Sequence, residues 1–343
     1  MCLTRFVALL FLIVLSSCSA RESKPLQNSF YYWQFNAPAT DSFSSGAASL
    51  GVEHFYLHYM DVGWDDRLHV PVPIAQLQTR QWAGQIPVMH TPVVFITKKV
   101  FRNISDAWCD TLAEKISIRI NKMSEEMTKT SPKTDMPNEI QIDCDWTAQS
   151  KEKYFTFLKK LKSINPSIKI SATIRMYPYK YSDKMGVPPV DQGVLMCYNL
   201  GQIRDKRTHN SIFELAELKK YFRKDRYPLP LDIALPVFGW HVWFREQQLK
   251  GILYEMPAQL PASAFSLLKQ GQYQVTKDTV WQGQYLREGD LLRSEYPEAA
   301  SLQAAAELLK KEQPDYRRII FFHWSSTNVY TYERLIKEIY SAY

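Results

Sequence analysis

The sequence predicts an α/β protein, a (β/α)8 (TIM) barrel, on three observations. Strand-like and helix-like segments alternate along most of the 343 residues, eight segments have the composition of buried strands, and a helical pattern closes the chain. An open doubly wound sheet is the alternative, but no GxGxxG motif follows the first strand. The eight strands are predicted at 30–35, 54–61, 86–96, 139–146, 169–177, 193–199, 231–240 and 318–324.

The segments between the strands have apolar residues three and four positions apart, which is the spacing of one helix face. Helices are predicted at 106–127, 150–162 and 331–343. The alternation breaks between strands seven and eight, where residues 245–315 are predicted to form an insertion with β-rich segments and one helix. Because barrels carry their sites on the loops that follow the strands, we expect this insertion to act as a lid or to contact a ligand directly.

The N-terminus has the pattern of a bacterial lipoprotein signal. The apolar run from Phe6 to Leu15 is too short to span a bilayer permanently but suits a signal peptide. Residues 15–18 (LSSC) resemble a lipobox, which implies cleavage before Cys18 and lipidation of that cysteine with diacylglycerol and a palmitate-type acyl chain. An ordinary secretory signal cut after Ala20 is the alternative.

These features divide the chain into a signal peptide (1–17), a tether (18–29) and a barrel domain (30–343). A lipidated Cys18 would make the membrane a partner, and the non-acidic Ser19 resembles an outer-membrane address. We therefore expect a cell-envelope location, at the outer membrane of a bacterium. The sequence leaves the oligomeric state open.

Composition excludes several other classes. The formal charge is +7, but no run of five basic residues occurs, so no nucleic-acid partner is expected. Cys109, Cys144 and Cys197 show no CxxC spacing, and His54 and His58 would be ~13 Å apart along a strand. We therefore expect no metal and no cofactor, with His58 in the lumen or the core.

The predicted fourth strand carries two carboxylates on one face. Asp143 and Asp145 are two residues apart, so both point the same way, while the intervening residues are apolar. Carboxylates this close repel each other in a poorly solvated lumen, which is typical of a catalytic pair. A buried salt bridge is the alternative, with Arg175 on the next strand as the partner.

Short motifs at four strands resemble those of chitinase-type glycoside hydrolases (family eighteen). Residues 143–147 (DCDWT) resemble the end of the family motif DGxDxDWE, 196–199 (MCYN) resemble M-x-Y-D, and 235–240 (LPVFGW) resemble L-P-x-Y-G-R. Residues 322–324 (FHW) resemble the eighth strand, which ends in a tryptophan under the sugar. The chain also resembles a set of bacterial barrel lipoproteins that share these motifs.

The resemblance implies roles for individual residues. Asp145 corresponds to the aspartate that orients the substrate's acetamido group, Asp143 to its supporting aspartate, and Tyr198 to the tyrosine that bonds the acetamido carbonyl. Thr147 occupies the position of the catalytic glutamate. A threonine cannot replace a carboxylic acid as proton donor, and such help is worth ~10²–10⁴-fold in rate. Asn199 in place of Asp and Trp240 in place of Arg are milder departures.

Three functions remain open. The first is a barrel that binds a glycan or polysaccharide without cleaving it, with Trp33, Trp240 and Trp324 stacking on sugars, and Arg175 and Asn199 as further contacts. The second is a glycoside hydrolase that uses another acid. The third is a structural envelope protein. Core packing is the alternative role for each tryptophan. The candidate acids of the second function are Asp145, Glu246, Glu255 and Asp290.

Overall fold

The computed structural model describes residues 26–342 except 39, 83–88, 132–134, 224, 255–256, 270, 282 and 314. The predicted signal peptide and Cys18 lie outside the described residues. In the part of the chain that is described, no helix has both the length and the apolar character needed to cross a membrane.

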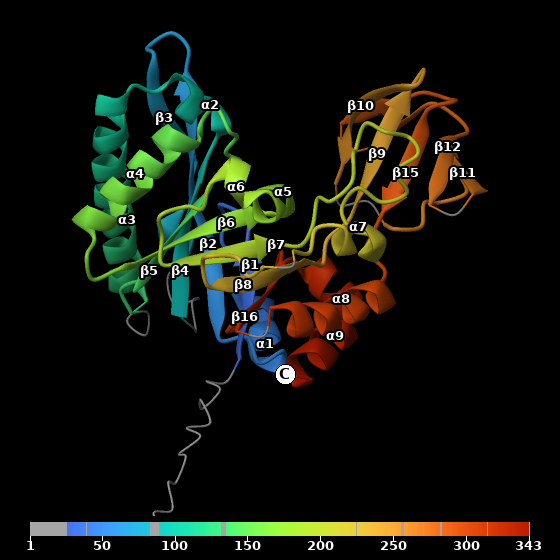
Figure 1. The fold of residues 1–343 in the computed structure, drawn as a ribbon. Coiled ribbons are helices and arrows are strands. Elements are labelled where there is room, and N and C mark those ends of the chain that lie inside the picture. The colour runs from blue at the N-terminus through green and yellow to red at the C-terminus, as the bar shows by residue number, and fades with distance from the viewer. Residues whose placement is uncertain are drawn as a thin grey trace, which may run out of the picture.

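Eight parallel strands form a closed barrel (Figure 1). The ring closes because β1 pairs with β2 on one side and with β16 on the other. The structure thus confirms the predicted fold class. In order around the barrel, the strands are β1 (Gln27–Tyr32), β2 (His54–Asp65), β4 (Met89–Ile96), β5 (Glu139–Asp143), β6 (Lys169–Arg175), β7 (Gln192–Met196), β8 (Leu231–Pro236) and β16 (Arg318–Phe322).

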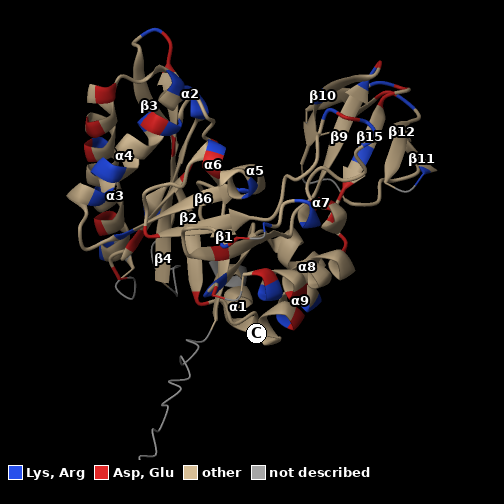
Figure 2. Ribbon diagram, viewed as in Figure 1, with Lys and Arg blue, Asp and Glu red and all other residues tan. Residues whose placement is uncertain are grey.

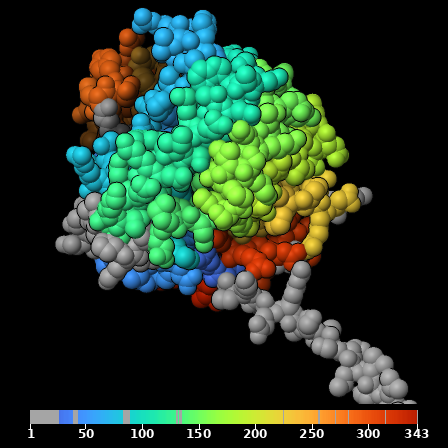
Figure 3. Space-filling view, turned by 90° about the vertical axis from the view of Figure 1, so that its left-hand side faces the viewer, coloured from blue at the N-terminus to red at the C-terminus, as the bar shows by residue number. Residues whose placement is uncertain are grey.

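Helices cover the outside of the barrel. The long helices α3 and α4 pack on each other, and Figure 3 shows them covering one side of the molecule. Both carry acidic and basic residues on their surface (Figure 2). A further strand, β3 (Val70–Gln76), pairs antiparallel with β2. The helices are α1 (Thr40–Ser49), η1 (Thr79–Trp82), α2 (Lys98–Asn103), α3 (Asp106–Thr130), α4 (Lys151–Ile164), α5 (Met176–Lys180), α6 (Ser182–Met185), α7 (Leu215–Lys219), α8 (Ala299–Glu312) and α9 (Ser326–Ser341).

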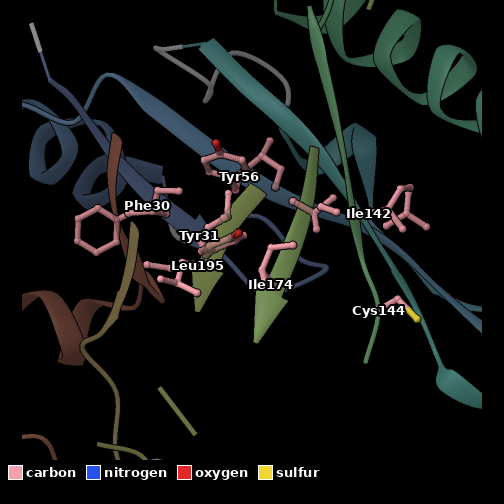
Figure 4. Packing of buried hydrophobic residues seen from close by; sticks show 14 of the residues in the cluster. Phe30, Tyr31, Tyr56, Ile142, Cys144, Ile174 and Leu195 are labelled. Carbon is pink, nitrogen blue, oxygen red and sulfur yellow. The ribbon is translucent and has the colours of Figure 1, made fainter. Parts of the chain in front are cut away.

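Side chains from alternate strand positions fill the lumen. In its middle, Tyr31 donates a hydrogen bond of 2.6 Å to Gln141 Oε1, and the rings of Tyr31 and Tyr56 lie 5.0 Å apart (Figure 4). Ile142 and Ile174, at intervening positions, are fully buried on the opposite face of the strands. The apolar core therefore lies between the strands and the helices, and polar groups occupy the lumen.

A charged network closes the end of the barrel at which the strands begin. Arg318 donates hydrogen bonds to Glu139 Oε2 at 2.6 Å and to the Tyr56 hydroxyl at 2.8 Å, and its guanidinium lies 3.9 Å from Asp232. Burial raises the pKa of Asp232 to about 6, although Arg318 opposes the shift. The charges of these groups compensate one another. A functional site is therefore expected at the opposite end of the lumen.

The segment between β8 and β16 forms a second, antiparallel sheet with its own small core, which includes Trp243, Phe265 and Leu292. Figure 1 shows this sheet standing to one side of the barrel. Its strands are β9 (Trp240–Arg245), β10 (Gln248–Leu253), β11 (Phe265–Lys269), β12 (Gln272–Val275) and β15 (Leu291–Glu295), with the hairpin β13 (Thr279–Trp281) and β14 (Gln284–Leu286) beside them.

The inserted sheet is fixed to the loop that follows β7. Arg293 donates hydrogen bonds to the carbonyl oxygens of Ile203 and Asp205, at 2.9 and 2.8 Å. The Ser211 hydroxyl donates one of 2.5 Å to Glu295, which is itself paired with Arg293 at 2.7 Å. The insertion therefore joins the barrel through hydrogen bonds between a buried ion pair of β15 and the loop after β7, at the end of the barrel where the strands finish.

Candidate active site at the barrel mouth

The carboxyl ends of the eight parallel strands meet at one end of the barrel, which we call the mouth. In barrels of this class, ligands bind at this end. Figure 1 shows the β2–β3 hairpin and the inserted sheet on different sides of the molecule. The residues that the strands bring to the mouth are Trp33, His58, Asp61, Asp143, Asp145, Thr173, Arg175, Tyr198 and Phe322.

Asp143 is the last residue of β5 and is 8% exposed. Thr173, opposite it on β6, donates a hydrogen bond of 2.5 Å to Asp143 Oδ1. Burial raises the pKa of Asp143 to about 7, and the negative charges of Asp145 and Asp61 act in the same direction. Asp143 forms no ion pair with any described residue. It can therefore exchange a proton near neutral pH.

Asp145 lies just beyond the end of β5 and is partly exposed. Its Oδ1 is 3.0 Å from Arg175 Nε, and Arg175 Nη2 donates a hydrogen bond of 2.9 Å to the Trp146 carbonyl. Arg175 is thus the partner of Asp145, as the salt-bridge alternative expected, but the pair is partly exposed and not buried, and it does not include Asp143. The two carboxylates that the sequence placed on one face have different partners and different surroundings.

Aromatic side chains form one wall of the mouth. The ring of Tyr198 stacks on that of Phe322 at 5.2 Å, and Trp33 lies 5.4 Å from Phe322. Phe238 makes edge-on contacts with both Tyr198 and Phe322. Tyr198 and Trp33 were predicted for this end of the barrel, whereas Phe322 and Phe238 were not proposed as ligand contacts.

Trp324 does not lie in the mouth. Its indole is 4% exposed and makes edge-on contacts with Phe30, Phe43 and Phe55 at 5.0 to 5.4 Å. These residues belong to the core beneath α1, so Trp324 packs there, whereas Phe322 lies in the aromatic wall of the mouth. The expectation of a sugar platform at Trp324 is replaced by core packing, the alternative considered for it.

Trp240 and Asn199 lie beyond the ends of the barrel strands β8 and β7. Trp240 starts the inserted strand β9, and its Nε1 donates a hydrogen bond of 2.7 Å to Glu295. Its ring makes edge-on contacts with Phe238 at 5.3 Å, so it stands beside the aromatic wall. Asn199 is exposed and has a positive φ of 55°, which places it in the turn after β7.

Thr147 lies in the turn between β5 and α4. Its amide donates a hydrogen bond of 2.9 Å to Ser150 Oγ, and its hydroxyl lies 3.3 Å from both Ser150 Oγ and Gln149 Oε1. The threonine therefore takes part in the start of α4, and it offers no acid at the position where the family motif has glutamate.

Two of the other proposed acids, Asp290 and Glu246, lie in the inserted sheet. Asp290 is buried in the inserted sheet, where it accepts hydrogen bonds of 2.8 Å from Arg245 and from Trp243 Nε1. Glu246 is in the turn between β9 and β10, beside a cavity of about 330 Å³ within the insertion. Glu255 lies outside the described residues.

A third carboxylate, which sequence reasoning missed, lies on β2. His58 Nε2 is 2.5 Å from Asp61 Oδ1, and the imidazole lies between the rings of Trp33 at 4.0 Å and Phe35 at 4.4 Å. Residues three apart on a regular strand face opposite ways. A β-bulge at Tyr59 brings these two to the same face. Nothing in the sequence marks this bulge.

A surface pocket of about 550 Å³ lies between the β2–β3 hairpin and the joint between α2 and α3. Trp64 and Trp108 line it, together with Arg102 and Asn103. None of the predicted site residues lines this pocket.

Comparison with known proteins gives a likeness of fold. A chitinase from Chromobacterium violaceum matches with a TM-score of 0.50 at 8% identity, over 93% of this chain and 99% of that one. The spore cortex-lytic enzyme SleL of Bacillus cereus matches with a TM-score of 0.48 at 15% identity, over 92% and 74%. A fungal endo-β-N-acetylglucosaminidase of glycosyl hydrolase family 18 matches at 0.49 and 8%, over 91% and 97%.

Neither a known protein family nor a curated protein matches the sequence. At 8% identity, the likeness to the Chromobacterium violaceum chitinase shows the fold alone, an eight-stranded parallel barrel.

Proposed function

We propose that this chain is a lipid-anchored protein of the cell envelope whose barrel mouth binds a glycan and does not cleave it by the chitinase-type reaction. The observation that carries this proposal is Thr147. It stands where that reaction needs a carboxylic acid, and its hydroxyl lies within hydrogen-bonding distance of Ser150 and Gln149 in its own turn. A group in this setting cannot donate a proton to a leaving sugar oxygen at neutral pH.

The mouth nevertheless has the parts that bind sugars. Trp33 and Phe322 are partly exposed and offer apolar surface on which the C–H face of a pyranose can pack, and the buried Tyr198 stacks on Phe322. Asp145 and Arg175 are both partly exposed at its edge and can form hydrogen bonds with hydroxyl groups. Polar groups next to apolar rings are the usual composition of a small-molecule site.

An active hydrolase is the second candidate, with Asp145 as its acid. The ion pair with Arg175 weighs against it, because Arg175 Nε lies 3.0 Å from Asp145 Oδ1 and occupies the place that a leaving sugar oxygen would need. A purely structural role is the third candidate. A structural role does not explain why Asp143 is buried without a cation in contact with it, since an uncompensated buried carboxylate costs stability.

The test uses the full chain, purified in a detergent without sugar groups. It is applied to a glycan array and, in parallel, to a reducing-sugar assay with the glycans that bind. We expect binding without release of reducing ends, and weaker binding by Asp145→Asn. Asp315→Asn is the matched control, because this carboxylate precedes β16, on the side away from the mouth, and is 60% exposed.

Turnover that disappears in Asp145→Asn would instead establish the hydrolase. If the protein neither binds nor cleaves any glycan, the carbohydrate function is wrong.

A further inference from the structure

The mouth holds more negative than positive charge. Three carboxylates face it, those of Asp61, Asp143 and Asp145, and among the described residues Arg175 is the permanent cation in contact with one of them. Arg175 contacts Asp145 alone. Asp61 is paired with the imidazole of His58, and Asp143 has the Thr173 hydroxyl.

The sheet register places Asp61 and Asp143 at the same level of the barrel. Asp61 is opposite Phe95 of β4, and Phe95 is opposite Asp143 of β5. Two strand spacings separate the two backbones, about 10 Å. Both side chains point into the lumen, so a ligand of the size of one sugar ring can contact both carboxylates.

One buried polar atom beside these carboxylates lacks a partner. It is the Nδ1 atom of His58, whose ring is 3% exposed and whose Nε2 faces Asp61; this Nδ1 has no hydrogen-bond partner among the described residues. Asp143, which is nine-tenths buried, accepts its hydrogen bond from Thr173 on Oδ1, which leaves Oδ2 for a ligand. Buried polar atoms are normally satisfied, so those that are not point to a group that the chain itself does not supply.

The surrounding rings favour a cation. Trp33, Tyr198 and Phe322 border the three carboxylates, and aromatic faces attract ammonium groups as well as sugar rings. A neutral glycan would leave the negative charge of the mouth uncompensated. A ligand that combines a pyranose ring with a positive charge would use both features.

We propose that the mouth selects a sugar that carries a free ammonium group, a de-N-acetylated hexosamine, over its neutral N-acetylated form. This inference rests on the proposed function and specifies the class of glycan that the mouth binds. Asp61 and Asp145 contact the ammonium group, Asp143 lies beneath it, and the aromatic wall holds the ring.

The experiment compares two soluble probes, the β-1,4-linked tetramer of glucosamine and the same tetramer fully N-acetylated. Binding of each to the full chain in sugar-free detergent is measured by calorimetry at pH 6.5 and low salt. We expect the glucosamine tetramer to bind at least tenfold more tightly. Asp61→Asn and Asp145→Asn should each weaken it fivefold or more and should weaken binding of the acetylated tetramer less, so that the preference for the glucosamine tetramer falls. Asp315→Asn removes the same charge far from the mouth and should change neither affinity.

The outcomes separate this inference from the proposed function. Equal or tighter binding of the acetylated tetramer overturns the amino-sugar inference and leaves a glycan-binding barrel. A preference for the free amine that both mouth variants retain, or that Asp315→Asn removes, shows that general surface charge is responsible and also overturns it. If neither tetramer binds and no glycan on the array binds, both the amino-sugar inference and the proposed function are wrong. The thermal unfolding of each variant is recorded, and Asp145→Asn, at a partly exposed position, serves if Asp61→Asn does not fold.

Discussion

The Thr173 hydroxyl and the Asp143 carboxylate meet at 2.5 Å across β5 and β6, at a level of the barrel where Asp143 has no ion-pair partner among the described residues. One neutral hydrogen bond does not compensate the burial of a charge. Ionisation of Asp143 therefore destabilises the folded barrel, because its carboxylate is buried without a counter-charge in contact with it.

Asp143→Asn should stabilise the protein at high pH. The pKa of Asp143 is about 7 in the folded chain and 3.8 ordinarily, so the folded state binds the proton more tightly than the unfolded state. The stability that the protonated Asp143 side chain contributes is fully present below the ordinary pKa and is lost as the pH rises through about 7. The asparagine keeps the bond from Thr173 and avoids the buried charge. The gain at pH 8 is at most roughly 1.4 kcal/mol for each unit of pKa difference.

Urea unfolding at pH 4 and pH 8 measures this effect. The two proteins should be similar at pH 4 and should diverge by pH 8. Asp145→Asn is the comparison, because its partly exposed ion pair with Arg175 is worth ~1 kcal/mol or less. A variant that is less stable than the wild type at pH 8 would contradict this account of Asp143.

Trp324→Ala and Phe322→Ala should have different consequences. Truncating Trp324 leaves a cavity among the rings of Phe30, Phe43 and Phe55, with an expected loss of about 3–5 kcal/mol in the free energy of unfolding. Truncating Phe322 removes part of the aromatic wall, so glycan affinity should fall by up to about tenfold. Calorimetric binding and thermal unfolding of both variants check the assignment. Loss of affinity in a folded Trp324→Ala protein, with Phe322→Ala unaffected, would reverse it.

Glu295→Gln should destabilise the junction between the barrel and the insertion. The change leaves the Arg293 guanidinium buried without its counter-charge, for which about 3–5 kcal/mol is typical. Limited proteolysis should then cut within the inserted sheet before the barrel. Glu333→Gln is the control, since its pair with Lys337 is on the surface of α9 and is worth ~0.5 kcal/mol. Equal effects of the two substitutions would show that the buried pair does not hold the junction.

Gly239→Ala should also disturb this junction. A Cβ at this position would lie 2.2 Å from Cδ1 of Tyr296, so the ring or the backbone has to move. Overpacking of this kind costs about 1–3 kcal/mol. Gly251→Ala, where the nearest atom of Trp243 is 3.8 Å from the added Cβ, should be tolerated. Thermal unfolding of the two variants gives the comparison. A Gly239→Ala protein as stable as the wild type would show that Tyr296 moves freely.

The sequence predicted the eight barrel strands because each is a short apolar run between polar turns. It placed most of their carboxyl ends too far along the chain. β5 ends at Asp143, β7 at Met196 and β8 at Pro236, each three or four residues before the predicted end. The apolar residues beyond these ends pack under the loops of the mouth, so hydrophobicity continues where strand pairing stops. Trp240 was assigned to the barrel for this reason.

The helix near the C-terminus begins before its apolar stripe. Helix α9 starts at Ser326 because the Ser325 hydroxyl accepts a hydrogen bond from the Asn328 amide, whereas the prediction started at 331. Asp143, Asp145 and Tyr198 could be proposed from strand alternation and the family motifs. The His58–Asp61 pair could not, since the bulge that aligns it at Tyr59 depends on the pairing of β2 with β4.

The parallel direction of the strands fixes how an anchored molecule would be oriented. β1 begins at Gln27, on the floor of the barrel, opposite the mouth. The proposed lipid on Cys18 would be nine residues from Gln27, and these residues would span at most ~30 Å when fully extended. With the anchor at the floor of the barrel, the mouth would point away from the bilayer and could bind polymer strands that lie beyond the membrane surface.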